Sequence, residues 1–317
     1  MYTMPTLKDL LPSKLHDVLE RANICTIKEI SILSINEMRK FTNLCNEDIL
    51  LIKNIVCHHF CPKIITSDLL ETDVRITTGC DALNDILKGG YRRGTITEVY
   101  GESGCGKTQL AMQSALNNWQ KGSVLICTED LFPVKRFEQL KKGLLTYNPD
   151  IDYGENIFVE HVTEAQDLLS CIRVRLPKLL TKHKPALIVI DSIAAPFRVE
   201  ITNYIQRAEE LREVAVTLLK IAKIFDLAIL CINQVSASFN ENVELLPSLG
   251  LAWSNMISTR IWIKKTTSCI DVRTITCDNT VKSKGEVYIR EAHVMFAPDV
   301  PNSLIKFVIT ELGIIAI

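Results

Sequence analysis

The sequence lacks an excess of charge of either sign, with 36 lysine and arginine residues against 37 aspartate and glutamate residues in 317 positions. Proteins that bind nucleic acid through a broad basic field carry a large positive charge. The balance excludes that class, so any contact with nucleic acid has to be local. The chain is also 47% hydrophobic, which is enough for one large domain and a small one.

Long hydrophobic runs are missing as well. The longest apolar stretches, such as ALIVI and LAILCI, are too short to cross a bilayer and have the length of buried strands. The first ten residues already contain charged side chains, and the 11 cysteines show no disulfide-like spacing. We therefore expect no membrane span and a reducing compartment, the cytosol or the nucleus.

A phosphate-binding loop is present at GESGCGKTQL, residues 101–110. In the pattern G-x-x-x-x-G-K-[ST], backbone N–H groups surround the phosphates, the lysine reaches the β- and γ-phosphates and the hydroxyl ligates Mg²⁺. An apolar segment precedes the loop and a helical pattern follows it, whereas a glycine-rich surface turn, the alternative, needs neither. The residues expected at the nucleotide are Gly101, Glu102, Ser103, Gly104, Cys105, Gly106, Lys107, Thr108 and Gln109.

Three polar residues stand at the ends of predicted strands. Asp191 ends ALIVID and is expected to hold Mg²⁺ together with Thr108. Glu129 ends SVLICTE, a strand whose end is expected to neighbour the phosphate loop, and is the candidate that activates the attacking water. Gln234 follows LAILCIN and can sense the γ-phosphate. The structural alternatives are a helix cap for Asp191 and plain turn residues for the other two.

Residues 1–61 are predicted to form a small helical domain. Ser13, Thr26 and Ser34 have the character of helix N-caps, and the last two are followed three positions later by a glutamate. A longer helix is expected over NEDILLIKNIVCHHF, residues 46–60. Residues 62–73 begin with a proline and mix polar with apolar side chains, as is typical of a linker.

Residues 74–317 are predicted to form an α/β core. Strand-like runs alternate with helical patterns, which indicates a mostly parallel central sheet covered by helices on both faces. After residue 250 the pattern changes to alternating strands, which favours an antiparallel C-terminal extension of the same sheet. The expected strands include ITEVY, SVLICTE, NIFVEH, ALIVID, LAILCIN, STRIWIKK, GEVYIREAHVMF and LIKFVIT.

The segment TTGCDALNDILKGGYRRGTITEVYGESGCGKTQL, residues 77–110, resembles the opening of RecA-type recombinase cores. CTEDLFPVKRFEQL, LIVIDSIAAPFR and LCINQV resemble the family's catalytic-glutamate, Mg²⁺-aspartate and sensor-glutamine segments. The LSGGQ-like segment of transporters, the NKxD motif of GTPases and an arginine-rich kinase lid are missing. The resemblance runs from about residue 10 to the C-terminus, and we identify the sequence as a member of the RecA-like eukaryotic recombinase paralogues.

The resemblance implies a RecA-like P-loop ATPase core with ATP and Mg²⁺ as cofactors. It implies that Glu129, Lys107 and Gln234 take part in hydrolysis and that Arg136 stacks on the adenine. It also implies homologous-recombination repair of DNA double-strand breaks, in the nucleus with a cytoplasmic pool allowed.

Two loops depart from those of a strand-exchanging recombinase. The loop after Gln234, residues 235–250, has no lysine or arginine and carries two glutamates, and the loop after Asp191 offers only Arg198 and Arg207. Phosphate neutralisation supplies most of the affinity for single strands, so these loops predict weak DNA contact. We therefore expect a weak, DNA-stimulated ATPase that works as a heterodimer with another RecA-like paralogue. It would assist assembly of the main recombinase filament or junction processing on single-stranded or branched DNA.

Two rival functions stay open: a self-sufficient strand-exchange ATPase and a nucleotide-binding scaffold without significant hydrolysis. The helical domain is expected to be a docking module, because FTNLCNED lacks the glycines of a duplex-binding hairpin, although Asn43 could adopt a left-handed conformation. CHHFC, with Cys57, His58, His59 and Cys61, has zinc-ligand residue types but no second ligand pair. The alternative is a helix end with buried thiols.

Overall fold

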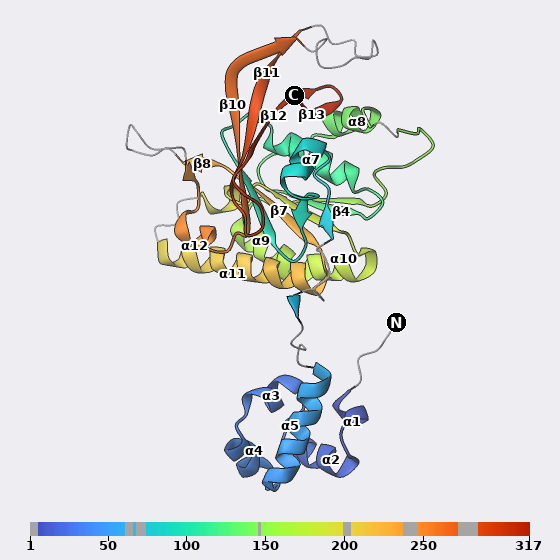
Figure 1. The fold of residues 1–317 in the computed structure, drawn as a ribbon, viewed down its shortest axis with the longest axis vertical. Coiled ribbons are helices and arrows are strands. Elements are labelled where there is room, and N and C mark those ends of the chain that lie inside the picture. The colour runs from blue at the N-terminus through green and yellow to red at the C-terminus, as the bar shows by residue number, and fades with distance from the viewer. Residues whose placement is uncertain are drawn as a thin grey trace. The chain divides into compact units, whose positions relative to one another are not determined.

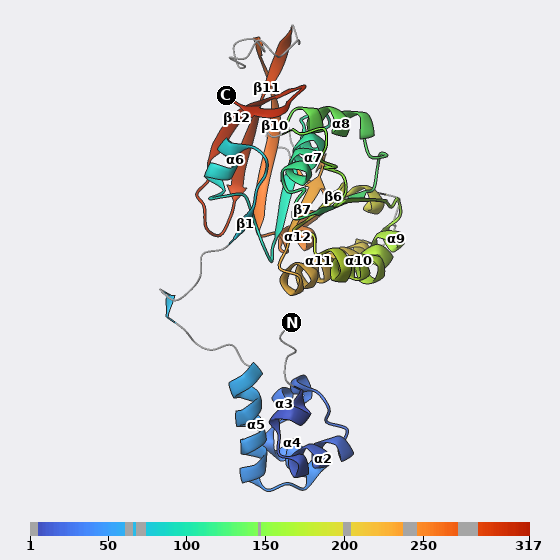
Figure 2. The same cartoon turned by 90° about the vertical axis from the view of Figure 1, so that its right-hand side faces the viewer.

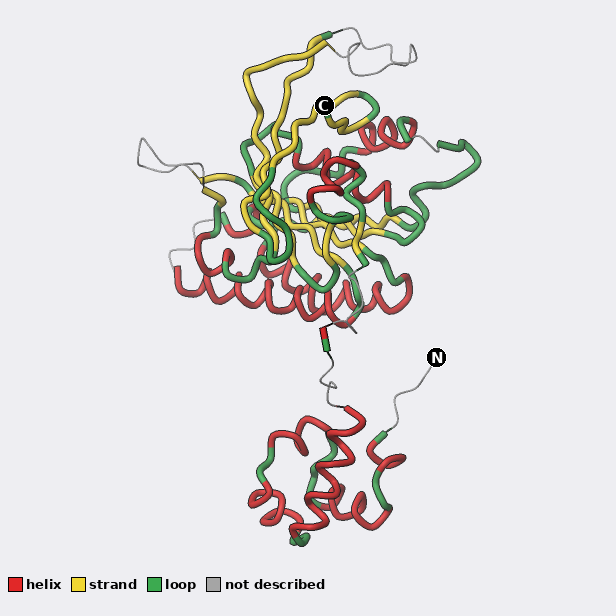
Figure 3. Tube along the Cα trace, in the orientation of Figure 1, coloured by secondary structure: helices red, strands yellow, loops and turns green. Residues whose placement is uncertain are grey.

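The computed structural model describes residues 6–60, 66–67, 74–144, 147–198, 204–236, 246–271 and 285–317. The chain divides into two compact units, residues 1–72 and residues 73–317. The described secondary structure of the first unit is helical apart from its turns, and the second combines helices with strands (Figure 3).

The N-terminal unit consists of short, individually capped helices. Capping boxes join Thr26 to Glu29 and Ser34 to Glu37, as predicted. Ser13 was predicted to be a cap, but it is the first helical residue, and Pro12, with extended backbone angles, takes the cap position. The described helices are α1 (Leu7–Leu10), α2 (Ser13–Arg21), α3 (Ile27–Ile32), α4 (Ile35–Thr42) and α5 (Asn46–Phe60).

Helix α5 supplies the centre of this unit's core. Ile49, Ile52 and Val56 are buried, and they belong to the same cluster as Ile30 of α3. Asn43 follows α4 with a φ of 55°, so it does adopt the left-handed conformation open to it. The unit therefore has its own hydrophobic core.

The second unit is built on a nine-stranded sheet of described residues with the order β13-β12-β11-β10-β3-β7-β6-β4-β5. Pairing is parallel from β10 to β5 and antiparallel from β10 to β13, which confirms the predicted sheet. Sequence patterns missed β13. The strands are β3 (Ile96–Tyr100), β4 (Ser123–Cys127), β5 (Ile157–His161), β6 (Leu187–Asp191), β7 (Ala228–Asn233), β10 (Thr259–Asp271), β11 (Glu286–Phe296), β12 (Leu304–Thr310) and β13 (Gly313–Ala316).

Helices cover both faces of this sheet, with α7 and α11 on opposite sides (Figures 1 and 2). Ile188 and Ile190 of β6 pack into the cluster on the α11 side, whereas Leu187 and Val189 pack into the cluster on the α7 side. The helices are α6 (Asp81–Ile86), α7 (Lys107–Asn117), α8 (Val134–Lys142), α9 (Ala165–Ser170), the π-helix Cys171–Arg175, α10 (Leu176–His183), the 3₁₀ turn Ala195–Phe197, α11 (Tyr204–Ile224) and α12 (Gly250–Ser254). None of the helices in the described ranges is long and apolar enough to span a membrane.

Two short ribbons complete the unit. They pair β1 (Arg75–Ile76) with β2 (Tyr91–Arg92) and β8 (Val235–Ser236) with β9 (Leu246–Pro247). The second ribbon begins directly after β7. Its first strand therefore starts beside the polar residues at the end of β7.

Candidate nucleotide site

The phosphate-binding loop connects β3 to α7, as predicted, and its backbone is tightly packed against the rest of the core. A Cβ on Gly101 would lie 2.2 Å from the backbone oxygen of Ile263, and one on Gly106 would lie 2.4 Å from Cδ1 of Ile309. Gly106 also has a φ of 109°. Only glycine fits at these two positions, so the loop packs directly against β10 and β12.

Lys107 and Thr108 begin α7 and face two different partners. The Lys107 Nζ donates to the backbone oxygens of Gly101 and Glu102, at 2.8 and 2.7 Å. The Thr108 Oγ1 donates to Oδ2 of Asp191 at 2.6 Å. The loop, the start of α7 and the end of β6 are thereby joined in one site.

Asp191 is a carboxylate whose pKa is raised by its place in the site. Burial raises its pKa, while the hydrogen bond from Thr108 and the charge of Lys107 lower it. The charges of Glu129 and Asp130 raise it further. The hydroxyl and carboxylate oxygens gathered here are the hard ligands that Mg²⁺ prefers, so these residues fit the expected metal.

Glu129 lies beside the phosphate loop, as predicted for the end of its strand. Strand β4 does not neighbour β3, because β7 and β6 lie between them. The carboxyl ends of parallel strands nevertheless meet at the same edge of the sheet, and Glu129 lines the same cavity as the loop. Both of its carboxylate oxygens accept from Nε2 of Gln234, at 3.0 and 2.8 Å, and Oε1 also accepts from Nη1 of Arg198 at 2.9 Å.

The cavity has a volume of about 870 Å³ and gathers most of the predicted nucleotide residues. Glu102 and Cys105 are not among its lining residues; Cys105 is buried beneath the loop, and burial raises the pKa of its thiol. Predicted residues that line the cavity are Gly101, Ser103, Gly104, Gly106, Lys107, Thr108, Gln109, Glu129, Arg136, Asp191 and Gln234.

Arg136 fixes one end of the cavity. Its guanidinium donates to Oε1 of Gln109 at 2.7 Å and to the backbone oxygens of Thr310 and Glu311 at 2.6 and 3.1 Å. The turn after β12 therefore forms part of the wall. Sequence reasoning missed this wall, because about 200 residues separate it from the loop and no motif marks it.

A buried hydrogen-bond network lies under the site and was also missed. Glu98 of β3 is fully buried and accepts from Nδ2 of Asn233 at 2.7 Å, from Nε1 of Trp253 at 2.8 Å and from Arg260. The Oδ1 of Asn233 in turn accepts from the backbone N–H of Gln234 at 2.7 Å. The network thus links the phosphate-loop strand to the backbone of the sensor-glutamine position.

The predicted DNA contacts fall in two places. Arg198 lines the nucleotide cavity and pairs with Glu129, while Arg207 lies on α11 and does not line the cavity. The loop segments 199–203 and 237–245 lie outside the described residues.

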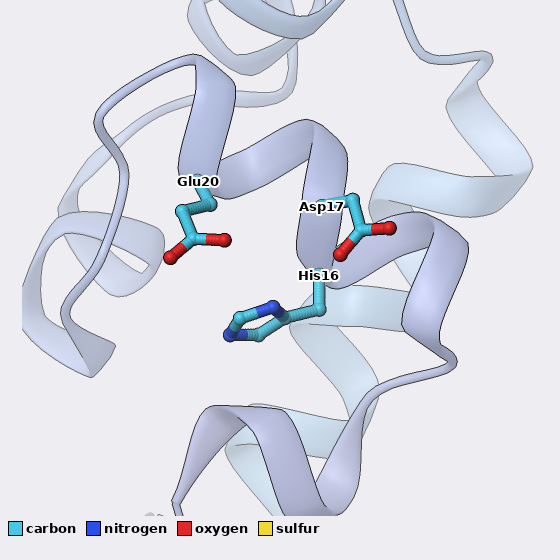
Figure 4. Close-up of side chains that lie close together, drawn as sticks. All are labelled: His16, Asp17 and Glu20. Carbon is cyan, nitrogen blue, oxygen red and sulfur yellow. The ribbon is translucent and has the colours of Figure 1, made fainter.

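The predicted zinc-ligand types receive no support from the described part of the chain. Cys57 is exposed, and Cys61 and the side chain of His59 lie outside the described residues. The group of potential metal ligands found among the described residues is His16, Asp17 and Glu20, on α2 (Figure 4). It consists of a half-buried histidine and two exposed carboxylates, a common surface arrangement.

Comparisons with known proteins agree with this geometry. The sequence profile of the Rad51 family matches residues 71–317. The chain is 31% identical to "DNA repair protein XRCC3" of Mus musculus over 96% of both chains, and 25% identical to "DNA repair protein rhp57" of Schizosaccharomyces pombe over 95% of both. The RadB recombinase structure matches with a TM-score of 0.61 and 25% identity, over 76% of this chain and 99% of that one. Segments such as CINQVSASF and FAPDVPNS had indicated similarity to the third X-ray repair cross-complementing paralogue, and this is confirmed.

Proposed function

Since this chain belongs to the Rad51 family, we propose that it binds ATP and Mg²⁺ in the cavity at the strand ends and acts in homologous-recombination repair. The observation that carries the proposal is the convergence of Lys107, Asp191, Glu129 and Gln234 on one cavity. These residues come from four segments of the chain, and a structural cap or turn would not require them to meet. Proteins named for DNA repair among the relatives support the biological setting.

In this proposal each residue of the site has a separate role in hydrolysis. Lys107 binds the β- and γ-phosphates, and Thr108 and Asp191 hold Mg²⁺, which stabilises negative charge on the phosphates when bound. Glu129 orients the attacking water and accepts its proton, and Gln234 contacts both the γ-phosphate region and Glu129. The guanidinium of Arg136 stacks on the adenine.

We further propose that the chain is one subunit of a nuclear heterodimer with another RecA-like paralogue, assisting recombinase assembly or junction processing on DNA. The support is the charge of the loop after Gln234, which contains no cation. An acidic loop holds single-stranded DNA poorly unless a partner supplies positive charge. If the purified chain alone forms strand-exchange-competent filaments, it is a self-sufficient recombinase and this part of the proposal fails.

The ATP site is tested with the full-length chain purified together with its natural partner. Lys107→Ala should abolish ATP binding measured by calorimetry, and Glu129→Gln should keep binding but lose hydrolysis. Lys121→Ala, an exposed lysine after α7, is the matched control and should behave as wild type. Equal ATP affinity of wild type and Lys107→Ala would overturn the proposed site.

One observation favours a nucleotide-binding scaffold as the second candidate. Glu129 already accepts from Gln234 and Arg198, so no oxygen of this candidate base is left without a partner. Cells that carry Glu129→Gln distinguish the two functions. Full DNA repair in these cells supports the scaffold, whereas repair as poor as with Lys107→Ala supports the ATPase.

A further inference from the structure

Arg290 of β11 is a cation in the wall of the nucleotide cavity without a counter-charge among the described residues. Its Nε is shielded from solvent and has no hydrogen-bond partner, and its Nη1 donates to the backbone oxygen of Tyr288 at 2.9 Å. Burial lowers the pKa of the guanidinium, as expected for a cation that has lost water without gaining an anion. Such a group is costly until an anion approaches it.

The other two arginines of the cavity wall are already satisfied. Arg136 donates to Gln109 and to two backbone oxygens, and Arg198 pairs with Glu129. Arg290 therefore differs from them in having unused donors inside a cavity built for a phosphate chain. Among the cavity's described arginines, it is the one available to an anionic ligand.

Arg290 approaches the phosphate loop from the side opposite to the proposed metal site. In the sheet, β11 and β10 lie on one side of β3, and β7 and β6, which carries Asp191, lie on the other. A Cβ on Gly106 would lie 3.8 Å from Cδ of Arg290, so the arginine stem runs along the last glycine of the loop. An anion in the loop is thereby bordered by Arg290 on one flank and by the Thr108–Asp191 pair on the other.

We propose that Arg290 is a phosphate-binding residue of this site and contacts the phosphate chain of the nucleotide from the β11 side. The inference rests on the proposed ATP binding and adds a second cation to Lys107. A guanidinium suits this task because its forked donors match phosphate oxygens in pairs. The Nε of Arg290 gains the partner that it lacks in the protein alone.

A purely structural role for Arg290 makes different predictions. Its stem packs near Gly106 and its Nη1 bonds to Tyr288, so a structural arginine would affect folding and all ligands of the cavity alike. If Arg290 instead binds phosphate, its substitution weakens the binding of ATP and ADP but not that of adenosine, which has no phosphate. The ratio of ATP affinity to adenosine affinity separates these two roles.

The experiment compares Arg290→Gln, Arg290→Lys and wild type in the full-length chain. Affinities for ATP, ADP and adenosine are measured with Mg²⁺ by displacement of a fluorescent nucleotide, and Tm is recorded for each variant. Lys265→Gln is the matched control. Lys265 is an exposed cation that lies directly opposite Arg290 in the β10–β11 pairing, and it does not line the cavity.

Arg290→Gln should lower the ATP-to-adenosine affinity ratio by about tenfold or more, Arg290→Lys should recover part of it, and Lys265→Gln should leave it unchanged. A ratio within twofold of wild type in Arg290→Gln overturns the inference, even where Lys107→Ala shows that ATP binds. If Arg290→Gln does not fold, an ATP-to-adenosine affinity ratio in Arg290→Lys equal to that of wild type overturns it, because lysine lacks the forked donors of arginine. A wild-type chain that binds no nucleotide overturns the proposed function itself.

Discussion

The side-chain amide of Gln234, at the end of β7, donates to both carboxylate oxygens of Glu129, at the end of β4, with distances of 3.0 and 2.8 Å. The two strands are not neighbours, since β6 lies between them. The contact therefore spans the strand that ends in Asp191. It places the candidate catalytic base, the candidate sensor and the candidate metal ligand in a row across the sheet edge.

Glu129→Gln is expected to lower ATP hydrolysis at least about a hundredfold and to leave ATP affinity within about threefold of wild type. The amide keeps the shape of the side chain but cannot accept a proton from water. Single-turnover hydrolysis and calorimetry measure the two effects. A rate within tenfold of wild type would show that another group activates the water.

Arg198→Ala is expected to raise basal hydrolysis several-fold without changing stability by more than about 0.5 kcal/mol. The Arg198 and Glu129 side chains are 45% and 42% exposed, so their ion pair contributes little to folding. The Arg198 guanidinium does donate to Oε1 of Glu129, and this hydrogen bond makes the oxygen a poorer acceptor for the proton of the attacking water. Steady-state ATPase assays check this, with Arg198→Lys as the charge-retaining control. A lower rate in Arg198→Ala would show that the arginine positions Glu129 for catalysis.

Glu98→Ala is expected to lower the free energy of unfolding by about 3 kcal/mol or more, because it leaves Arg260 without its buried partner. Ser248→Ala removes a single hydrogen bond of the same network, from its hydroxyl to Oδ1 of Asn233, and should cost about 1 kcal/mol. Urea denaturation measures both. Equal losses in the two variants would mean that the charge pair adds nothing beyond an ordinary hydrogen bond.

Gly101→Ala is expected to disturb the phosphate loop much more than Gly104→Ala does. A Cβ on Gly101 meets the backbone oxygen of Ile263 at 2.2 Å, whereas one on Gly104 meets nothing within 4 Å. Gly104→Ala should cost only the strain of a positive φ, roughly 1–2 kcal/mol. Gly101→Ala should displace the loop and abolish ATP binding. Retained ATP affinity in Gly101→Ala would show that the loop relaxes around the new methyl group.

Acid is expected to weaken the N-terminal unit through the capping boxes at Thr26 and Ser34. Hydrogen bonds from Thr26 and Ser34 lower the pKa of Glu29 and Glu37 from 4.5. A lowered folded pKa stabilises the unit above pH 4.5, and the stabilisation is lost as the pH falls through the folded value. Isoleucine-methyl NMR of the full-length chain follows this loss through the buried Ile30.

Glu29→Gln combined with Glu37→Gln should make the same NMR signals less sensitive to pH between 6 and about 3. Glu47→Gln is the control, because Glu47 is exposed in the first turn of α5 and makes no such capping box. An unchanged pH dependence in the double variant would assign the acid sensitivity to other groups.

Local patterns in the sequence were sufficient for most of the elements and for much of the site. The capping boxes at Thr26 and Ser34 rest on contacts between residues three positions apart, so the sequence shows both partners at once. The phosphate loop is equally local, because Gly106, Lys107 and Thr108 are adjacent. Asp191 and Gln234 were recognisable because each ends an apolar strand of a parallel sheet, whose carboxyl ends share one edge.

Only the tertiary structure determined which residues far apart in the sequence come into contact. The order of the strands separates β4 from β3, and it brings Arg290 and the turn after β12 against the loop. Arg198 had the character of a DNA contact by its place in the sequence but lies against Glu129. Glu98 showed no pattern at all, because its partners Asn233, Trp253 and Arg260 come from distant segments. Sequence periodicity reports which side of an element is buried, whereas strand order and the packing of distant segments determine which residues share a site.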